Sequence, residues 1–399
     1  MTSPPPAAPL DAPRDSVIAW TKRLVSIDTT SRDSNLPLIE LVATELRELG
    51  VAAHIRPDPT GDKANLIATI PAADGGVTGG VVLSGHTDVV PVDGQTWTSP
   101  PFAPEIRDGR LYGRGTCDMK GFLAVALALV PDMQAAPLRE PIHLAFSYDE
   151  EVGCLGGEQI VKDIAELGLH PRVALIGEPT SMRVILAHKS VNIAEIVVTG
   201  LAAHSSRKPY ALNAIEHAAT LVARIRALGD RYASQGPYDP AYDVAHSTIG
   251  VNQISGGIAF NTVADRCELG CDFRTIAAVD PQDVADELRA YAADLEREMK
   301  ALHPAGSATV TIGAMTPGLE SSPEGPAARL SLELGATLSG QKVAYGTEAG
   351  QFSESGIDAV VVGPGDIAQA HGPDEYVELS QLAACEALIG RLIRHLSRP

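Results

Sequence analysis

Apolar residues in the opening part of the chain recur with two different periods. Helical spacing is found at residues 16–27, 38–49, 121–130 and 156–167. Short apolar runs typical of buried strands lie among these stretches, at residues 51–55, 65–70, 81–83, 142–146 and 173–176. Pro131 is expected to end the third helix, because proline cannot donate the hydrogen bond that a helix interior requires. This alternation predicts an α/β domain in which helices cover a largely parallel sheet.

The middle of the chain has a different pattern. It predicts two short β-runs within residues 184–199 and longer strands at residues 247–254, 263–273 and 308–312. Two helices are predicted between these strands, at residues 213–228 and 280–302. The second begins at Asp280-Pro281, a pair typical of a helix cap and the first turn after it. Several strands with two helices predict a small α+β unit.

The α/β pattern returns after Pro317. Two helices are predicted on either side of one more strand, at residues 324–338, 379–397 and 359–362. The simplest organisation is therefore one α/β catalytic domain interrupted by an inserted α+β domain. From the N-terminus, the predicted order is a flexible tail rich in Pro and Ala, the first part of the catalytic domain, the inserted domain and the second part of the catalytic domain, at residues 1–13, 14–183, 184–314 and 315–399.

The composition excludes several classes of protein. Asp and Glu number 50 against 31 Lys and Arg, which gives a formal net charge of -19. Nucleic-acid binding needs clustered cations, so no nucleic-acid partner is expected. No uncharged apolar run is long enough to cross a bilayer, and the N-terminus lacks the basic start of a signal peptide. The five scattered cysteines predict reduced thiols in a cytoplasmic protein that has no membrane partner.

Polar residues follow the ends of several predicted strands. His86 and Asp88 come directly after the strand at 81–83, and in an extended segment they would project from the same face. Three consecutive acids at 149–151 follow the strand at 142–146. Buried acids are costly unless a cation or solvent compensates them. Because α/β enzymes keep their sites at the carboxyl edge of the sheet, we expect these side chains to meet there.

Two histidines and three acids are candidate metal ligands. Each lies at the edge of an element in the α/β part of the chain: His86, Asp118, Glu151, Glu178 and His371. Each one alone has an ordinary explanation, since Asp118, for instance, precedes a helix and could simply cap it. Together they match what two zinc-like ions require, with one imidazole and one terminal carboxylate for each ion and a shared bridging carboxylate.

Six segments together resemble a known family. They read SGHTDVVP, GRGTCDMKG, DEEVGCLGG, GEPT, AAHSS and HGPDE. In this combination the sequence is similar to the co-catalytic zinc metallopeptidases that include acetylornithine deacetylase, succinyl-diaminopimelate desuccinylase, aminoacylase-1 and a glutamate-releasing carboxypeptidase. The resemblance covers nearly the whole chain after the N-terminal tail. It implies a zinc-aminopeptidase-like three-layer catalytic domain with an inserted ferredoxin-like domain that serves as a lid and for dimerisation.

The resemblance also implies how two divalent ions would be held. His86 and Glu178 would bind one ion, Glu151 and His371 would bind the other, and Asp118 would bridge them. Zinc is the expected metal, although cobalt or manganese could occupy the same ligands.

Three further residues are implied to take part in catalysis. Asp88 resembles the residue that orients the site, and Glu150 matches the general base. A water between two cations has its pKa lowered toward neutrality. Glu150 would accept its proton during attack on an amide carbonyl and then return a proton to the leaving amine. His204 would help to stabilise the oxyanion, and in this family that histidine reaches the partner subunit's active site, which implies a homodimer.

The substrate implied is a small N-acyl amino acid. Asn261 and Arg274 resemble substrate-binding residues, and Arg274 suits a bidentate contact with a carboxylate. The segments at 148–154 and 345–352 look most like acetylornithine deacetylases, which implies hydrolysis of N-acetyl-L-ornithine in arginine biosynthesis. Glu348 is then predicted to face the distal ammonium of the ornithine side chain.

Other functions stay open at this stage. Removal of a succinyl group, an aminoacylase activity or cleavage of dipeptides would use the same fold, because the size of the acyl pocket cannot be read from the sequence. A non-catalytic binding protein of this fold is a further alternative, although no expected ligand or base is missing. A nucleotide-binding enzyme is excluded, because the glycines at 113 and 115 lack the rest of a phosphate loop.

Overall fold

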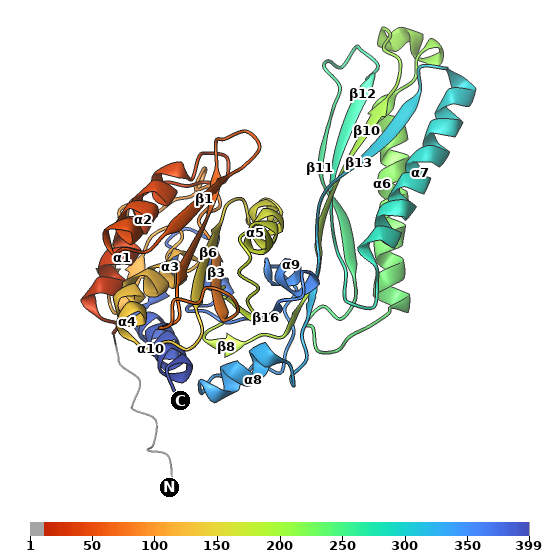
Figure 1. Cartoon of the computed structure of the whole chain (residues 1–399). Helices are drawn as coiled ribbons and strands as arrows, with labels where there is room; N and C mark the ends of the chain where they lie inside the picture. The colour runs from red at the N-terminus through yellow and green to blue at the C-terminus, as the bar shows by residue number, and fades with distance from the viewer. Residues whose placement is uncertain (1–11, 399) are drawn as a thin grey trace. The chain divides into compact units, whose positions relative to one another are not determined.

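A computed structural model describes residues 12–398. The tail predicted at residues 1–13 therefore lies almost entirely outside the described residues. The chain forms two compact units (Figure 1). Unit 1 contains the described residues up to Ala187, Glu320–Gly340 and those from Thr347 onward, and unit 2 contains His188–Leu319 and Gln341–Gly346.

A six-stranded sheet forms the centre of unit 1. Its order is β1 (Ala53–Pro57), β2 (Ala64–Ile70), β6 (Ile142–Ser147), β3 (Val81–His86), β7 (Val173–Ile176) and β16 (Asp358–Val361). The last four strands are parallel neighbours, whereas β1 and β2 are antiparallel additions. The sheet is thus mixed at one edge, and its parallel part is where β6, β3 and β7 lie side by side.

Helices cover both faces of this sheet. They are α1 (Asp15–Val25), α2 (Leu36–Glu48), α3 (Lys120–Ala128), α4 (Val130–Ala135), α5 (Leu155–Glu166), α8 (Pro326–Glu333), α9 (Ala349–Glu354) and α10 (Leu379–Leu396). Figure 1 shows α1 to α4 and α10 on one side of the sheet and α5 and α9 on the other. Every residue of α3 is buried, as expected for an apolar helix between the sheet and the helices outside it. The predicted three-layer α/β architecture is confirmed.

Two predictions about helix ends in unit 1 were wrong. Pro131 does not stop the helical region, because it occupies the first turn of α4, where a missing N–H does no harm. The helix expected over 324–338 ends at Glu333. Gly335 then adopts a left-handed φ of 76°, and the strand β15 (Thr337–Leu338) follows.

Short strands complete the description of the chain. Three of them form a small sheet, namely β4 (Glu105–Arg107), β5 (Arg110–Tyr112) and β17 (Tyr376–Glu378). The others are β8 (Arg183–Val184), which pairs with β15, and β9 (Ala187–His188), which pairs with β14 (Leu319–Glu320). Two 3-10 turns are also present, η1 (Ser205–Tyr210) and η2 (Ile367–Gln369).

Unit 2 is a four-stranded antiparallel sheet with two long helices. The strand order is β11 (Thr248–Gly256), β12 (Arg266–Arg274), β10 (Val191–Thr199) and β13 (Ser307–Thr316), and the helices are α6 (Ala214–Gln235) and α7 (Pro281–Leu302). Buried and more exposed residues alternate along β10, so one face of the sheet packs against the helices. Asp280 caps α7 by accepting a hydrogen bond from Gln282 N at 2.8 Å.

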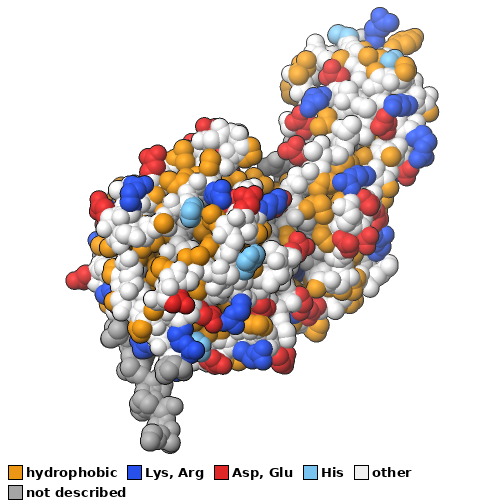
Figure 2. Space-filling model, in the orientation of Figure 1, with side chains coloured by type: hydrophobic (Ala, Val, Ile, Leu, Met, Phe, Trp, Pro, Cys, Tyr) orange, Lys and Arg blue, Asp and Glu red, His pale blue; other side chains and the backbone are white. Residues whose placement is uncertain are grey.

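Charged side chains of both signs are dispersed over the face drawn in Figure 2. On that face the net charge of -19 is therefore not concentrated in one acidic patch. Within residues 12–398, no helix is both long and apolar enough to cross a membrane. All five cysteines are buried free thiols.

Candidate active site

Three neighbouring parallel strands end beside one another and carry polar residues at those ends. His86 is the last residue of β3 and pairs in register with Ser147 at the end of β6. Glu150 and Glu151 follow β6 in a tight turn, and Glu178 lies two residues beyond β7. The apolar runs of the strands bury them in the core, and the carboxyl edge of the sheet therefore presents these polar groups together.

Asp118 lies between two imidazole rings. Its Oδ1 atom is 3.0 Å from His86 Nε2, and its Oδ2 atom is 3.2 Å from His371 Nε2. Each ring has a second carboxylate neighbour: Glu178 Oε1 lies 3.7 Å from His86 Nε2, and Glu151 Oε2 lies 3.1 Å from His371 Nε2. The structure thus brings all five candidate ligands into one cluster.

The cluster contains more negative charge than its hydrogen bonds neutralise. Hydrogen bonds to Asp118 and then to Glu151 raise the pKa of His371 to about 10. Burial and the charge of Asp118 raise the pKa of Glu151 to about 7. Burial and Asp118 likewise raise the pKa of Glu178, and its buried Oε1 has no hydrogen-bond partner among the described residues. Such shifts are typical of carboxylates gathered in a buried site that suits a compensating cation.

The donor atoms lie close enough together to hold metal ions. The ligand atoms of His86, Asp118 and Glu151 lie within 4.8 Å of one another, and so do those of His86, Glu150 and Glu178. These two groups share His86 and divide the acids differently from the predicted assignment. Imidazole nitrogens and carboxylate oxygens are ligands that zinc and similar divalent ions accept. The donor set and the orphaned oxygen of Glu178 therefore suit the predicted pair of divalent ions.

Asp88 connects the segments that carry the cluster. Its carboxylate accepts hydrogen bonds from Ser31 Oγ at 2.7 Å, from Glu150 N at 3.1 Å and from Glu151 N at 3.3 Å. Its backbone oxygen lies 2.9 Å from His86 Nδ1 and so orients the ring. Burial would raise the pKa of Asp88, but His86, Ser31 and the Glu150 amide outweigh that effect and lower it. Nothing in the sequence indicated the part played by Ser31.

Glu150 lies beside this cluster. Burial is the main cause that raises the pKa of its carboxyl, followed among the raising effects by the charges of Glu151 and Asp118. The Cys154 thiol donates a hydrogen bond to Glu150 Oε1 at 3.4 Å, and burial raises the pKa of that thiol, so it stays protonated. Sequence reasoning overlooked Cys154, although it lies within the same acidic motif.

Glu348 is a buried carboxylate with little compensation for its charge. It lies at the N-terminus of α9 with 1% of its surface exposed. The Ser147 hydroxyl interacts with this carboxylate and lowers its pKa, but by less than burial raises it. Gln351 Oε1 lacks a hydrogen-bond partner in the described chain. Both groups face Gly157, where a Cβ atom would lie 2.1 Å from Gln351 Oε1 and 2.9 Å from Glu348 Oε1. Burial raises the pKa of Glu348 to about 7.

The remaining predicted residues lie in unit 2. His204 and Asn261 are both exposed and are adjacent, because Ser205 N donates to Asn261 O at 2.9 Å. Arg274 is at the far end of the nine-residue strand β12, where its Nε lies 3.3 Å from Asp272 Oδ1. At about 3.3 Å per residue, β12 separates Arg274 from the His204–Asn261 end by roughly 25 Å. Within one unit 2, Arg274 is therefore not brought together with the other two.

Comparison with known proteins assigns the family. The sequence profile of "Peptidase family M20/M25/M40" matches residues 82–395. The chain belongs to this family. It is therefore a hydrolase of amide bonds. An acetylornithine deacetylase from Proteus mirabilis (strain HI4320) is 34% identical over 379 residues, which cover 94% of this chain and 94% of the relative. An acetylornithine deacetylase from Myxococcus xanthus is 34% identical over 380 residues, covering 94% and 96%.

Solved structures of other M20 proteins have the same fold. A metallo-carboxypeptidase from Sulfolobus solfataricus has a TM-score of 0.74 at 17% identity, covering 96% of this chain and 100% of its own. A tripeptidase from Staphylococcus aureus has a TM-score of 0.73 at 19% identity, covering 98% and 100%. A Bacillus subtilis protein described as a dinuclear metal binding peptidase has a TM-score of 0.63 at 15% identity, covering 96% and 97%.

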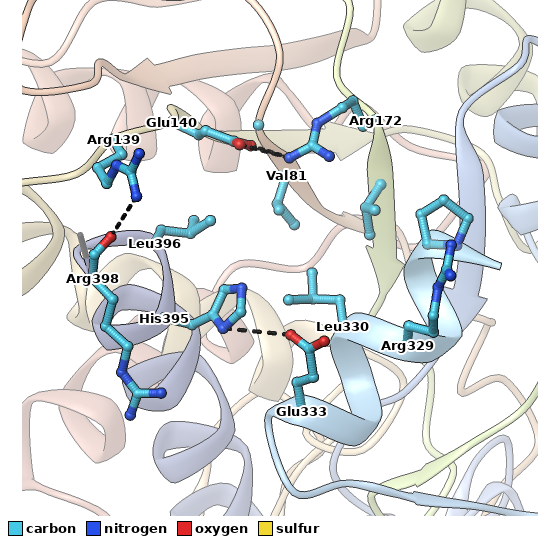
Figure 3. A pocket seen from close by; sticks show the side chains of 13 residues that line it. Val81, Arg139, Glu140, Arg172, Arg329, Leu330, Glu333, His395, Leu396 and Arg398 are labelled. Carbon is cyan, nitrogen blue, oxygen red and sulfur yellow. Dashed lines mark hydrogen bonds and ion pairs between the residues drawn. The ribbon is translucent and has the colours of Figure 1, made fainter. Parts of the chain in front are cut away.

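The M20 chain also has a basin of about 580 Å³ in unit 1 (Figure 3). It lies where β3 and β7 begin, at Val81 and Val173, and therefore at the opposite edge of the sheet. Its two acids each face a basic side chain: Arg172 bonds both oxygens of Glu140, and His395 Nδ1 lies 3.7 Å from Glu333 Oε2. The basin is thus not the place where the acids and imidazoles gather.

Ionisation of Glu348 is predicted to destabilise the metal-free fold. The pKa of this carboxyl is about 7 in the folded chain, against an ordinary value of 4.5. When folding raises a pKa, the group costs no folding free energy at a pH below its pKa in the unfolded chain. The cost grows as the pH rises and stops growing once the pH exceeds the pKa in the folded chain. Glu348→Gln should therefore become more stable relative to the wild type, by on the order of 2 kcal/mol, between pH 5 and pH 8.

Urea unfolding at both pH values, with a chelator present, measures this difference. Glu354→Gln is the matched control, because Glu354 is an exposed carboxylate of the same helix. It should show the same small change at both pH values. An equal difference between Glu348→Gln and the wild type at pH 5 and pH 8 would contradict the prediction.

Proposed function

We propose that this M20 enzyme hydrolyses the amide bond of an N-acyl amino acid, with N-acetyl-L-ornithine as its substrate. The observation that carries the proposal is the cluster of two imidazoles and three carboxylates around Asp118, next to the half-buried Glu150. The choice of substrate is supported by relatives named acetylornithine deacetylase that match 94% of the chain at 34% identity. Its products would be L-ornithine and acetate, as in a cytoplasmic enzyme of arginine biosynthesis.

Two divalent ions would be held by the five clustered residues. His86 and Glu178 would bind one, Glu151 and His371 would bind the other, and Asp118 would bridge them, as the distances to its two oxygens favour. Bound ions of this kind would lower the pKa of a water molecule and polarise an amide carbonyl. Zinc is the proposed metal, with cobalt as an alternative.

Glu150 is proposed to move the proton. In the active form its carboxylate accepts a proton from the attacking water and returns it to the amine nitrogen as the C–N bond breaks. Asp88 keeps the turn that carries Glu150 in place through the backbone amide, and the Cys154 thiol restrains one carboxylate oxygen. The same burial that raises the pKa of Glu150 favours its taking up a proton at neutral pH.

Glu348 is proposed to bind the distal ammonium of ornithine. Its two oxygens and Gln351 Oε1 are buried acceptors, and the donor beside the carboxylate, the Ser147 hydroxyl, carries no charge. An ammonium group brings three donors and a positive charge, which would satisfy them. Neutral N-acyl amino acids lack that charge. The α-carboxylate is proposed to bind Arg274 and Asn261, with bidentate contact through Arg274.

A homodimer is proposed on the basis of unit 2. Its edge strand β11 is exposed along Asn252–Gly256, and a neighbouring loop presents two apolar side chains to solvent, Ile258 at 87% and Phe260 at 110% of full exposure. Exposed strand edges and apolar side chains favour association. A second copy would supply His204 and Asn261, while Arg274 belongs to the first copy. This division agrees with their separation along β12.

Loss of the general base is predicted to abolish turnover without loss of metal. Wild-type protein, stripped of metal and restored with Zn²⁺ or Co²⁺, should release ornithine from N-acetyl-L-ornithine. Glu150→Gln should lower kcat by about 10²- to 10⁴-fold, because the proton acceptor is gone. A panel of N-succinyl and other N-acyl amino acids and dipeptides tests the alternative substrates. Metal-bound protein that hydrolyses none of them would instead favour a non-catalytic binding protein.

Glu348→Gln is predicted to remove the preference for a charged side chain. The measurement is the ratio of kcat/KM for N-acetyl-L-ornithine to that for N-acetyl-L-norleucine, which has a methyl group in place of the ammonium. Truncating one partner of a buried charge pair costs 2–5 kcal/mol, so the ratio should fall by roughly 100-fold. The control is Glu354→Gln, which should leave the ratio unchanged. An unchanged ratio in Glu348→Gln would rule out this contact.

Subunit complementation tests the shared active site. His204→Ala and Glu150→Gln should each be nearly inactive, because each variant lacks one group in both sites. After unfolding and refolding of an equal mixture, about half of the dimers are mixed, and each mixed dimer keeps one complete site, so roughly a quarter of wild-type activity should return. No recovery in a mixture that contains mixed dimers would contradict action of His204 on the partner's site.

A further inference from the structure

A buried ion pair next to the cluster has no assigned role. Arg114 Nη1 lies 2.6 Å from Glu375 Oε2, and each side chain is only 1% exposed. Charged side chains are almost never buried so completely unless they are paired, and a buried pair is often no more stabilising than apolar residues of the same size. The contacts that the two side chains make with their surroundings therefore need an explanation beyond stability.

Glu375 holds the turn that carries Asp118. Its second oxygen, Oε1, accepts hydrogen bonds from Cys117 N at 2.9 Å and from Asp118 N at 3.1 Å. Two amides bonded to one charged oxygen fix the backbone from which the Asp118 side chain projects. Asp118 is the carboxylate between the two imidazoles, so its position decides the distance between them.

Arg114 holds the loop that carries His371. Its Nη2 donates to His371 O at 3.3 Å and to Gln95 Oε1 at 2.7 Å, and Gln95 Nε2 donates to the same His371 oxygen at 2.8 Å. Its Nη1 also donates to Gly372 O at 3.3 Å. The guanidinium lies 5.1 Å from the centre of the Trp97 ring, which limits its movement.

These hydrogen bonds hold the backbone of His371, while its ring contacts Asp118 and Glu151. Its backbone has a φ of 63°, which is unfavourable for a residue with a side chain, and its side chain is 51% exposed, so packing does little to hold it. The donors on its carbonyl, Arg114 and Gln95, keep that conformation. The planar fork of an arginine can reach Glu375, Gln95 and two carbonyls at once, whereas a lysine ammonium cannot.

We infer that Arg114 and Glu375 are positioning residues that set the spacing between Asp118 and His371. This inference rests on the proposed function, because these two side chains are proposed ligands of the divalent ions. The pair acts through the backbone and touches no substrate. Its two charges compensate each other, so it orders the cluster without adding net charge to it.

The test compares metal binding by full-length variants. Metal-stripped wild type and Arg114→Lys are titrated with Co²⁺, and the visible absorption spectrum of the bound ions is recorded. Arg114→Lys keeps the charge but loses the fork. It should bind one of the two ions about 10- to 100-fold more weakly, change the Co²⁺ spectrum and lower kcat more than it changes KM. Glu375→Gln should behave in the same way.

Two more variants make the comparison specific. Gln95→Ala removes one donor to His371 O without leaving a buried charge unpaired, so it should fold normally and still shift the spectrum. Arg172→Lys is the matched control, because its ion pair with Glu140 is exposed and lies at the opposite edge of the sheet (Figure 3). It should bind both ions like the wild type.

The inference is overturned if the folded variants bind Co²⁺ with the affinity and spectrum of the wild type. These variants are Arg114→Lys, Glu375→Gln and Gln95→Ala. That outcome leaves the proposed function intact if the wild type hydrolyses its substrate. Conversely, a wild type that binds two Co²⁺ ions but hydrolyses no N-acyl substrate contradicts the proposed function, while weaker binding by the variants still supports the positioning role.

Discussion

The carboxylate of Asp88 is the contact on which the rest of the site depends. It is buried, and it accepts hydrogen bonds from Ser31 and from the amides of Glu150 and Glu151, while its backbone oxygen orients His86. A buried polar group left without a partner costs about 1–3 kcal/mol, so these segments can fold only in one register. The strands β3 and β6 and the loop at Ser31 are thereby joined before any ligand enters.

That rigidity allows like charges to be held together. Asp118, Glu151 and Glu178 repel one another, and the raised pKa values of the two glutamates reflect this repulsion as well as their burial. Left to relax, a flexible loop would separate such groups. Three features keep these carboxylates close: the parallel strands, the Asp88 hydrogen bonds and the Arg114–Glu375 pair. The repulsion between the carboxylates lowers the stability of the fold at the place where a cation would bind.

The strands and the polar residues at their ends could be predicted from the sequence, because both depend on a local pattern. Contacts between residues far apart in the chain could not be predicted. Strands β6, β3 and β7 are apolar runs followed by polar residues, which is a local signal, and the acids at their ends were recognised. Pro131 was misjudged because a proline that ends one helix and a proline that begins the next look alike. The Arg114–Glu375 pair spans 261 residues and no periodicity encodes it, although both residues lie in motifs that had been recognised. The nearly complete burial of Glu348 could likewise not be read from the sequence.

The Cys154 thiol, which donates to Glu150, has a consequence for how the protein reacts with oxidants. Cys154 is 2% exposed, and its pKa is raised by burial and then by the charge of Glu150, so almost none of it is thiolate. Only the thiolate reacts readily with peroxide or alkylating reagents. Cys117, beside Asp118, is buried with a raised pKa as well. Two unreactive thiols thus lie beside the clustered acids and imidazoles. If a thiol reagent inactivates the protein, the cause would be unfolding of unit 1, which exposes these thiols, and not their modification in the folded site.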